Sequence, residues 1–415
     1  MKLFTTKSGT VSLVILCAVF LGALPARAAE MKFTPSLAVS EEYNDNVRDS
    51  ATDRRSDFIT RLQPGVAFMY RAPSVNGDLS YSFDYQNYAR GTVDNEENHN
   101  LNLKSTAEMV KNFFFLELSD TLSRVSLDVT RDVTTESLSA NQTDQNRGSV
   151  SPYLLWRLGE KNTLKTGYRF TDTSYWGSPG IDKREHRAFA EFNYDPTSRL
   201  NFNLGYAWSR TMTDLLDYNQ HDLHGGFRYE YLEKSFLFGG VGNSWQAPSV
   251  GSNVSNPFWN AGISRDFGNL AAMLETRVEY SEDPLAISTK TTSYSLAMEK
   301  SLQHGTVGLS SAYRKYLDTL ITAREQRKAE LGGYWRGELS PRLNATVTVS
   351  GDKVSRQSVQ DYAYHLNSGA GLSYGFNYDI AASLNYSYVE YRRDLESSAN
   401  ARQTNRVILS LKKVF

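Results

Sequence analysis

The feature that most constrains this sequence is a two-residue alternation of apolar and polar side chains that recurs to the end of the chain. In the segment 199–208 every second residue is Leu, Phe, Tyr or Trp, and the segments 78–88 and 361–374 alternate in a similar way. A period of two places successive side chains on opposite faces of a strand, whereas a helix would spread these apolar residues around its circumference. The sequence therefore predicts strands with one apolar and one polar face.

The connections between these segments alternate between short and long. Nine short turns, such as those at 110–112 and 232–234, separate ten longer polar stretches, of which 120–146 is the longest. This rhythm predicts about 20 antiparallel strands, within about 18 to 22, and an even number is expected for a closed up-and-down barrel. The first strand, predicted at 33–42, has the weakest signal because Pro35 interrupts it.

Composition favours a membrane barrel over a soluble sheet protein. Mean hydropathy is only -0.48, yet the chain holds 25 Tyr, 20 Phe and 6 Trp. A barrel in which only every second residue meets lipid has this composition, and aromatic residues form its interfacial girdles. A face that is polar along the whole strand cannot pack a dry core, and we find no blade or Greek-key repeat of a soluble propeller or sandwich. We predict an all-β fold, a single-chain antiparallel up-and-down transmembrane β-barrel with short periplasmic turns and long extracellular loops, embedded in outer-membrane lipid.

The first 28 residues are typical of a cleaved signal peptide. Lys2 and Lys7 precede the apolar stretch 11–24, and Ala26-Arg27-Ala28 supplies the small residues of a cleavage site. The stretch is too short to cross a bilayer core of about 30 Å comfortably at about 1.5 Å per residue, although an uncleaved anchor is the alternative. We therefore predict cleavage after Ala28, a barrel over residues 29–415 and a location in the cell outer membrane.

Cysteine and charge exclude several classes of function. Cys17, the only cysteine, lies within the predicted signal peptide, so the mature chain has no disulfide, thiolate metal site, cysteine nucleophile or c-type haem attachment. The 45 basic residues include Lys2, Lys7 and Arg27, so the mature balance is 42 basic against 46 acidic residues, or -4. A near-neutral mixture of this kind gives no footprint for nucleic acid.

The C-terminus matches a final barrel strand. Val407, Leu409 and Leu411 alternate up to the terminal Phe415, which is the pattern that the barrel assembly machinery recognises. Lys413 departs from this pattern, but a lysine near the interface can extend its ammonium group to water. The assembly machinery is therefore an expected partner.

The polar face of the strands should line the interior of the barrel. About 20 strands enclose a lumen too wide for side chains alone to fill, so a water-filled channel is expected unless a loop plugs it, and 120–146 is the best candidate for a plug or constriction. The charges on this face either meet solute in the lumen or pair with charges on neighbouring strands. The candidate lumen-facing charges are Arg61, Asp84, Lys104, Glu108, Arg157, Lys165, Arg169, Arg187, Glu191, Arg228, Glu230, Arg265, Glu275, Arg277, Glu279, Arg314, Lys328, Glu330 and Arg336.

Catalytic and metal sites receive little support. His221 and His224 are three apart and should point to opposite faces of a strand. The segment 44–53 offers oxygen ligands for calcium but lacks the glycine and closing glutamate of an EF-hand loop, which favours a solvated loop. A serine hydrolase would need a Ser, a His and an orienting partner gathered at one rim, and six histidines with many serines make chance matches common. We assign no catalytic, cofactor-binding or metal-binding residue and expect no cofactor.

The opening of the mature chain carries a family resemblance. Glu42-Tyr43-Asn44-Asp45-Asn46-Val47, followed by Asp57-Phe58-Ile59-Thr60-Arg61-Leu62-Gln63-Pro64-Gly65, resembles the start of the beta-barrel porin 2 group. It is also similar to the outer-membrane proteins associated with PEP-CTERM and exopolysaccharide gene clusters. The resemblance implies a pore that accompanies polysaccharide synthesis and export, with polysaccharide and export-complex proteins as partners. It carries over no catalytic residue.

Three functions remain open from the sequence. The first is a porin-like channel that passes polar solute, associated with exopolysaccharide export. The second is a plugged structural or binding barrel that recognises surface polysaccharide or a partner protein. The third is a hydrolase at the barrel rim, which would require a Ser–His cluster. The wide polar lumen favours the channel.

Overall fold

The structure is a computed structural model that describes residues 29–131, 141–177, 179–281, 283–320, 325–356, 362–394 and 401–415. The predicted signal peptide, with Cys17, lies outside the described residues. The strands are β1 (Glu30–Asn44), β2 (Asp57–Arg71), β3 (Val75–Tyr88), β4 (Glu96–Val110), β5 (Phe114–Ser126), β6 (Gln142–Arg157), β7 (Asn162–Trp176), β8 (Lys183–Thr197), β9 (Leu200–Thr213), β10 (Tyr218–Leu232), β11 (Ser235–Pro248), β12 (Val254–Asp266), β13 (Leu270–Ser281), β14 (Thr289–Leu302), β15 (Gly305–Asp318), β16 (Glu325–Ser340), β17 (Leu343–Arg356), β18 (Tyr364–Gly375), β19 (Ile380–Arg392) and β20 (Arg402–Val414).

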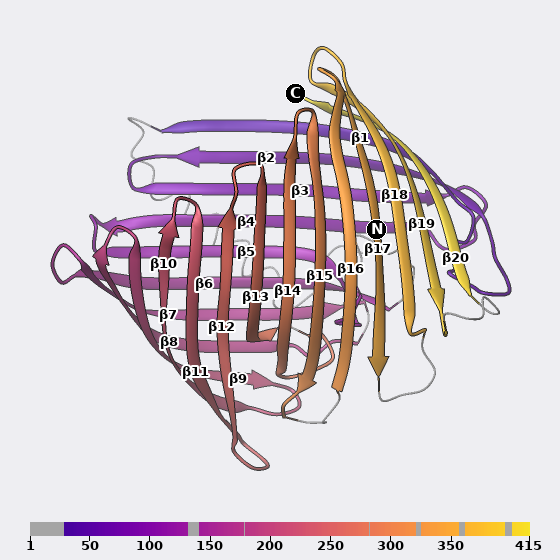
Figure 1. The fold of residues 1–415 in the computed structure, drawn as a ribbon. Helices are drawn as coiled ribbons and strands as arrows, with labels where there is room; N and C mark the ends of the chain where they lie inside the picture. The colour runs from indigo at the N-terminus through magenta and orange to yellow at the C-terminus, as the bar shows by residue number, and fades with distance from the viewer. Residues whose placement is uncertain are drawn as a thin grey trace.

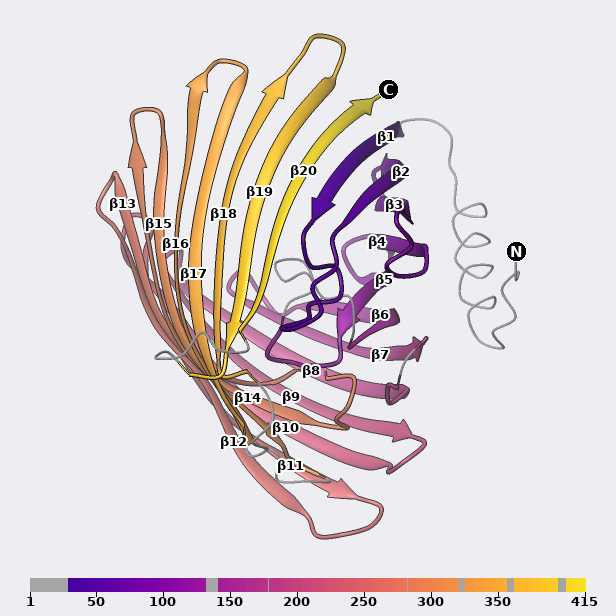
Figure 2. The ribbon, with the colours of Figure 1, turned by 90° about the vertical axis from the view of Figure 1, so that its right-hand side faces the viewer.

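These strands form one closed barrel. Each strand pairs antiparallel with the next along the chain, and β20 pairs with β1 from Ser36↔Val414 to Asn44↔Arg406. In Figure 1 the strands of the near and far walls cross, as expected when strands tilt strongly against the barrel axis. Figure 2 shows β20 beside β1 at the closure. Closure gives every strand a neighbour on both sides, and the prediction of about 20 antiparallel strands is confirmed.

Pro35 does not interrupt the first strand, which is longer than the predicted segment 33–42. The Pro35 carbonyl accepts a hydrogen bond of 2.9 Å from the Phe415 amide, where β20 ends. Donor and acceptor of one residue face the same neighbour in an antiparallel ladder, so the missing N–H of Pro35 faces the end of β20. The proline therefore removes no ladder hydrogen bond.

The outer face of the barrel is apolar and exposed. On β9, Phe202, Leu204, Tyr206 and Trp208 are exposed while the intervening Ala207 is buried. The last strand behaves in the same way, with Val407, Leu409 and Leu411 on its exposed face and Phe415 beyond it. Among the described residues no helix is long and apolar enough to cross a membrane, a finding that concerns helices alone. The exposed apolar band identifies the lipid-facing surface.

Tyrosine hydroxyls on this outer face contact histidines of the neighbouring strand. Tyr81 OH lies 2.8 Å from His99 Nδ1, and Tyr206 OH lies 2.8 Å from His221 Nδ1. Tyr168 and His186 form a third such pair. Rings with an apolar body and a polar tip suit the boundary between lipid and water.

The two ends of the barrel differ in their connections. Nine turns of two to four residues lie at the end where both termini of the described chain lie, and the connections at the opposite end have four to fifteen residues. Strands of 12 to 16 residues exceed the roughly 9–11 residues that a tilted strand needs to span a bilayer, so their ends project beyond the lipid. The short-turn end is periplasmic and the long-loop end is extracellular.

Candidate functional site: the lumen and its inward-folded loops

The strand registers place the predicted lumen charges on the inner face with one correction. Arg265 lies two residues from Ile263, which is 45% exposed on the outer face of β12, and therefore points outward. Its guanidinium lies 5.1 Å from the centre of the Phe267 ring at the periplasmic end of the strand. The sequence placed Arg265 inside because the alternation is ambiguous next to the turn. The other predicted charges alternate with the outward apolar residues of their strands.

Several of these inner charges pair with neighbours. Arg61 lies 2.8 Å from Glu42, whose side chain is only 1% exposed. Arg277 contacts Glu275 on its own strand, and Arg314 contacts Glu330 on the next. Cross-strand pairing, the alternative kept open from the sequence, thus accounts for part of the set.

Burial of the inner face changes along the barrel axis. Inward polar residues near the extracellular end are buried, among them Asp84, Thr171, Gln246 and His365. Inward polar residues nearer the periplasmic end are exposed, as at Asn102, Lys104, Asn344, Ser373 and Asn385. Since both groups face the lumen, something must cover the first group and not the second. Two extracellular loops lie beside three of these buried residues, Thr171, Gln246 and His365.

The first loop, between β5 and β6, crosses the lumen. Lys328 Nζ on β16 donates a hydrogen bond of 2.9 Å to the Thr130 carbonyl, and the Arg131 guanidinium lies 4.4 Å from the centre of the Tyr391 ring on β19. In a ring of twenty strands β5 and β16 lie on opposite walls. The loop lies within the predicted stretch 120–146 but is shorter, since β5 continues to Ser126 and β6 begins at Gln142. The described residues of this loop extend into the lumen, where a constriction would lie.

The second loop, between β13 and β14, also folds inward, and the sequence did not predict this. Lys183 Nζ on β8 donates to the Asp283 carbonyl at 3.0 Å, and the Ile181 amide donates to the Pro284 carbonyl at 2.8 Å. Gln246 on β11 donates to Ser288 Oγ at 3.0 Å. The apolar run 284–287 within a long loop was the available signal, because an apolar run in a loop needs a surface to bury it.

The wall opens locally where this second loop leaves it. Strands β12 and β13 pair only from Asn260↔Arg277 to Asp266↔Ala271. Above that point the end of the β13–β14 hairpin separates from β12 and turns inward, and Lys290 reaches Asn256 by a side-chain hydrogen bond of 3.4 Å. The separation allows a loop anchored on one wall to reach β8.

The two loops meet and divide the extracellular half of the lumen. Leu127 and Val129 of the first loop line the same small cavity as Leu285 and Ala286 of the second. A cavity of about 730 Å³ lies between the first loop and the wall β15–β18. Another, of about 350 Å³, lies between the second loop and the wall β6–β10.

The charges of the larger cavity neutralise one another. Lys328 Nζ lies 3.6 Å from both Glu330 and Asp352, and Arg314 contacts Glu330. His365 Nδ1 lies 2.9 Å from Asp352 Oδ1 and its ring packs edge-on against Tyr391. This cluster therefore holds the first loop in place.

The smaller cavity is more basic. Its lining includes Arg147, Lys165, Arg169, Lys183 and Arg187. Two carboxylates, Glu185 and Glu191, also line it. Sequence reasoning assigned Lys165, Arg169, Arg187 and Glu191 to the lumen but not Arg147 or Lys183. The structure adds that these strands bring the basic side chains together.

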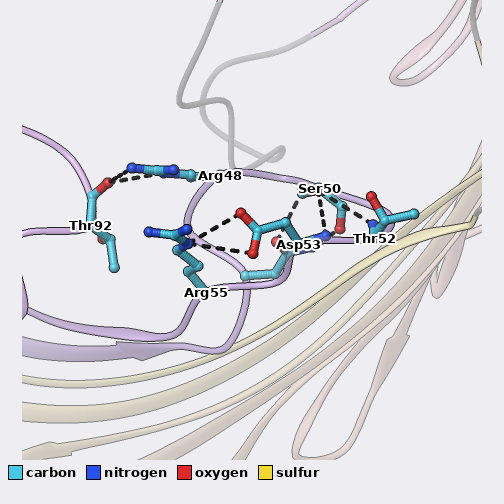
Figure 3. A network of polar contacts seen from close by, with 7 residues as sticks. Arg48, Ser50, Thr52, Asp53, Arg55 and Thr92 are labelled. Carbon is cyan, nitrogen blue, oxygen red and sulfur yellow. Dashed lines mark hydrogen bonds and ion pairs between the residues drawn. The ribbon is translucent and has the colours of Figure 1, made fainter.

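The segment 44–53, considered for calcium, instead closes the seam between the first and last strands. Asn46 Nδ2 donates to the carbonyls of Ser50 and Gln403, both at 2.9 Å. Figure 3 shows the rest of this loop, in which Ser50 Oγ accepts from the Asp53 amide and Arg55 pairs with Asp53. In the described part of the chain no cluster of three or more His, Cys, Asp or Glu residues could hold a metal ion.

Asp57 connects the β1–β2 loop to the β3–β4 loop. The fully buried carboxylate accepts hydrogen bonds from the amides of Phe58, Arg90 and Thr92 and from Thr92 Oγ1, the last at 2.7 Å. Burial by itself raises the pKa of the carboxyl, but these hydrogen bonds outweigh it and hold the pKa of Asp57 below its usual value. Arg48 also reaches across to the Thr92 carbonyl (Figure 3).

The histidines behave as the strand alternation predicts. His221 contacts Tyr206 on the outer face, while the His224 ring lies 6.2 Å from that of Phe258 on the inner face. With His365 directed at Asp352, these contacts give no support to a hydrolase at the rim.

Comparisons with known proteins identify the fold alone. No family model matches the sequence and no curated protein matches it. Among solved structures, the apoprotein of the FrpB iron transporter from Neisseria meningitidis has a TM-score of 0.56 at 9% identity, covering 92% of this chain and 81% of that chain. The ferric enterobactin receptor PfeA from Pseudomonas aeruginosa, a mutant in complex with enterobactin, has a TM-score of 0.54 at 10% identity, covering 94% and 82%. The siderophore receptor PirA from Pseudomonas aeruginosa has a TM-score of 0.51 at 10% identity, covering 94% and 81%. The chain is an outer-membrane β-barrel with the fold of these receptors.

Proposed function

We propose that this protein is an outer-membrane channel for polar solutes, narrowed at its extracellular end by the β5–β6 and β13–β14 loops. The observation that carries the proposal is the change in burial along the inner face. Exposed polar residues such as Lys104 and Asn385 line the periplasmic half, and buried ones such as His365 and Gln246 lie beside the loops. A wide polar lumen admits water and hydrated solutes, and a short narrow zone decides which of them pass.

Association with exopolysaccharide export is the finer part of the proposal. It rests on the resemblance of the opening segments 42–47 and 57–65 to the beta-barrel porin 2 group. In the structure Asp45 and Asn46 hold the seam between β1 and β20, and Asp57 holds the β3–β4 loop. This motif therefore supports a shared fold more directly than a shared solute. The hydroxyl- and amide-rich lumen is compatible with a saccharide chain.

A plugged binding barrel is the second candidate, favoured by the contact between the two inward loops. In that case the cavities would be reached from outside and the solute would not cross. No enzymatic role is proposed, because in the described part of the chain the histidine contacts given above are with tyrosine hydroxyls, a phenylalanine ring and Asp352.

Single-channel recording in planar bilayers separates the two candidates. We expect conductance steps from the refolded mature protein, and larger steps from a variant in which residues 284–287 are replaced by Gly-Ser-Gly-Ser. Silent recordings from both proteins, when gel mobility shows that both are folded, would instead favour the binding barrel.

A further inference from the structure

We propose that the cavity between the β6–β10 wall and the β13–β14 loop binds the anionic group of an acidic saccharide, a carboxylate in the first instance. This inference deepens the proposed channel function and rests on it. The cavity has a volume of about 350 Å³, which falls within the usual range for small-molecule sites of about 300–1,000 Å³. The cavity is lined by basic side chains that the carboxylates of the protein pair with only in part, and by several hydroxyl groups.

Like charges face each other across two neighbouring strands of this cavity. Arg169 on β7 and Arg187 on β8 are direct register partners and point into the lumen. Like charges in this arrangement repel and are destabilising unless an anion compensates them. Such a pair in the wall of a water-filled lumen is a ready position for an oxyanion, which two guanidinium groups can hold together.

The carboxylates of the protein compensate these arginines only in part. The closest carboxylate oxygen to Arg169 is that of Glu117 at 3.9 Å, and Lys165 approaches the same carboxylate at 3.8 Å. Arg187 lies 3.4 Å from Asp222 and 3.9 Å from Glu185. Except for the contact with Asp222, these distances exceed hydrogen-bond length, so the described carboxylates leave most guanidinium N–H groups available to a ligand.

Arg147 adds a cation without a carboxylate partner. Within the part of the chain that the structure describes, its side chain makes no ion pair, and it is exposed to the lumen. It stands on β6 opposite Thr173 of β7, one strand from Arg169. The three arginines thus point inward from three consecutive strands and line one cavity, with Arg147 four residues along the wall from Arg169. Together they are a wider target than a single cation offers.

The remaining lining suits a saccharide better than a bare ion. The hydroxyls of Thr171, Thr173, Ser209 and Thr211 line the cavity, and the rings of Phe189 and Tyr218 lie among them. Hydroxyls can exchange hydrogen bonds with sugar hydroxyls, and ring faces can cover the C–H surfaces of a sugar. In the larger cavity, by contrast, Arg314 and Lys328 are already paired with carboxylates, so that wall offers less to an anion.

Isothermal titration of the refolded full mature barrel in detergent tests the assignment without requiring an open channel. The probes are trigalacturonate, neutral maltotriose and inorganic phosphate. We expect trigalacturonate to bind more tightly than maltotriose, and its affinity to fall with added salt as screening requires. In R147Q/R169Q the affinity should fall by about tenfold or more, because two charge-assisted contacts are lost.

Lys104→Gln is the matched control, since Lys104 faces the lumen on β4 but does not line this cavity. Its affinity for trigalacturonate should equal that of the wild type. R147K/R169K keeps the charge and should recover part of the affinity. Such recovery would show that R147Q/R169Q loses affinity through its charge and not through misfolding. Gel mobility of the unheated proteins confirms that each variant forms a barrel.

The outcomes are distinct. Phosphate binding as tight as that of trigalacturonate, with the same loss in R147Q/R169Q, supports the anion site and assigns it to phosphate chemistry. Equal binding of maltotriose, an equal loss in Lys104→Gln, or no binding of any probe overturns the proposal. Binding of trigalacturonate together with silent bilayer recordings would contradict the channel function and support the anion site. Conductance without binding would support the channel function and contradict the anion site.

Discussion

The carboxylate of Asp45 accepts two hydrogen bonds from Asn405, one from its backbone amide and one from its side-chain Nδ2, each 2.7 Å long. The two residues are 360 positions apart and lie where the first strand meets the last. The backbone ladder between β1 and β20 holds this seam, and the chain has too few cysteines for a disulfide there. Side-chain hydrogen bonds at the extracellular end of the seam therefore add directly to the stability of closure. The Asn44-Asp45-Asn46 segment therefore acts as a structural fastener.

Substitution of Asp45 by Ala should weaken this seam. Hydrogen bonds to a charged group contribute about 1.5–3 kcal/mol each, and partial rehydration reduces the loss, so we expect about 2 kcal/mol lower stability. The measurement is urea unfolding of the refolded barrel followed by tryptophan fluorescence. Asp53→Ala is the control, because Asp53 pairs only with exposed Arg55 in the same loop. Equal stability of D45A and D53A would contradict the role of Asp45.

Asp57 should make the β1–β2 and β3–β4 loops sensitive to acid. Its folded-state pKa lies below its usual value, so its contribution to stability is present above the unfolded-state pKa of about 4 and is lost as the pH falls through the lower folded-state pKa. Hydrogen exchange of the Thr92 amide should accelerate, after correction for intrinsic rates, as the pH drops below about 4. In Asp57→Asn the corrected rate should already be high at neutral pH and should not depend on pH in that interval. A wild-type rate that stays constant through this range would argue against the carboxylate as the anchor.

The two faces of a strand should respond in opposite ways to the same charge. Leu204 is 55% exposed on the outer face of β9, whereas its neighbour Asn203 points inward. Arginine on the lipid face of a barrel costs about 2–4 kcal/mol near the bilayer midplane and little on the lumen side. We therefore expect Leu204→Arg to lower stability in lipid vesicles by that order, and Asn203→Arg to leave it nearly unchanged. The reverse ranking would show that the strand has been assigned the wrong face.

Release of the first loop should widen the lumen. The Lys328 ammonium donates to the Thr130 carbonyl and lies between Glu330 and Asp352. Lys328→Ala removes the anchor and leaves two carboxylates without it, so the loop should leave the opposite wall more often. Tryptic cleavage after Arg131 should become faster, and any conductance steps should become larger and noisier. Lys353→Ala, on the outer face of the next strand, should change neither readout.

The fold was largely predictable because its determinants are local. Alternation of apolar and polar residues is a property of each strand by itself, and the short turns fix which strands are neighbours. Arg265 shows the limit of this reasoning, since the alternation becomes ambiguous within a few residues of a turn. Asn44, Asp45 and Asn46 show another limit, because oxygen-rich residues look alike whether they bind a cation or, as here, the backbone of a distant strand.

The sequence by itself determined that this chain forms a closed barrel with a lipid-facing and a water-facing surface. It also placed the listed charges on the water-facing surface, with Arg265 as the exception. Only the tertiary structure decided that two loops enter the lumen and that the arginines of β6, β7 and β8 share one cavity. Those features depend on contacts between residues about 100 or more positions apart, such as Lys183 with Asp283 and Lys328 with Thr130. A strand pattern with a period of two carries no information about contacts across the barrel, because they are set by strand tilt, by closure and by where β13 separates from β12.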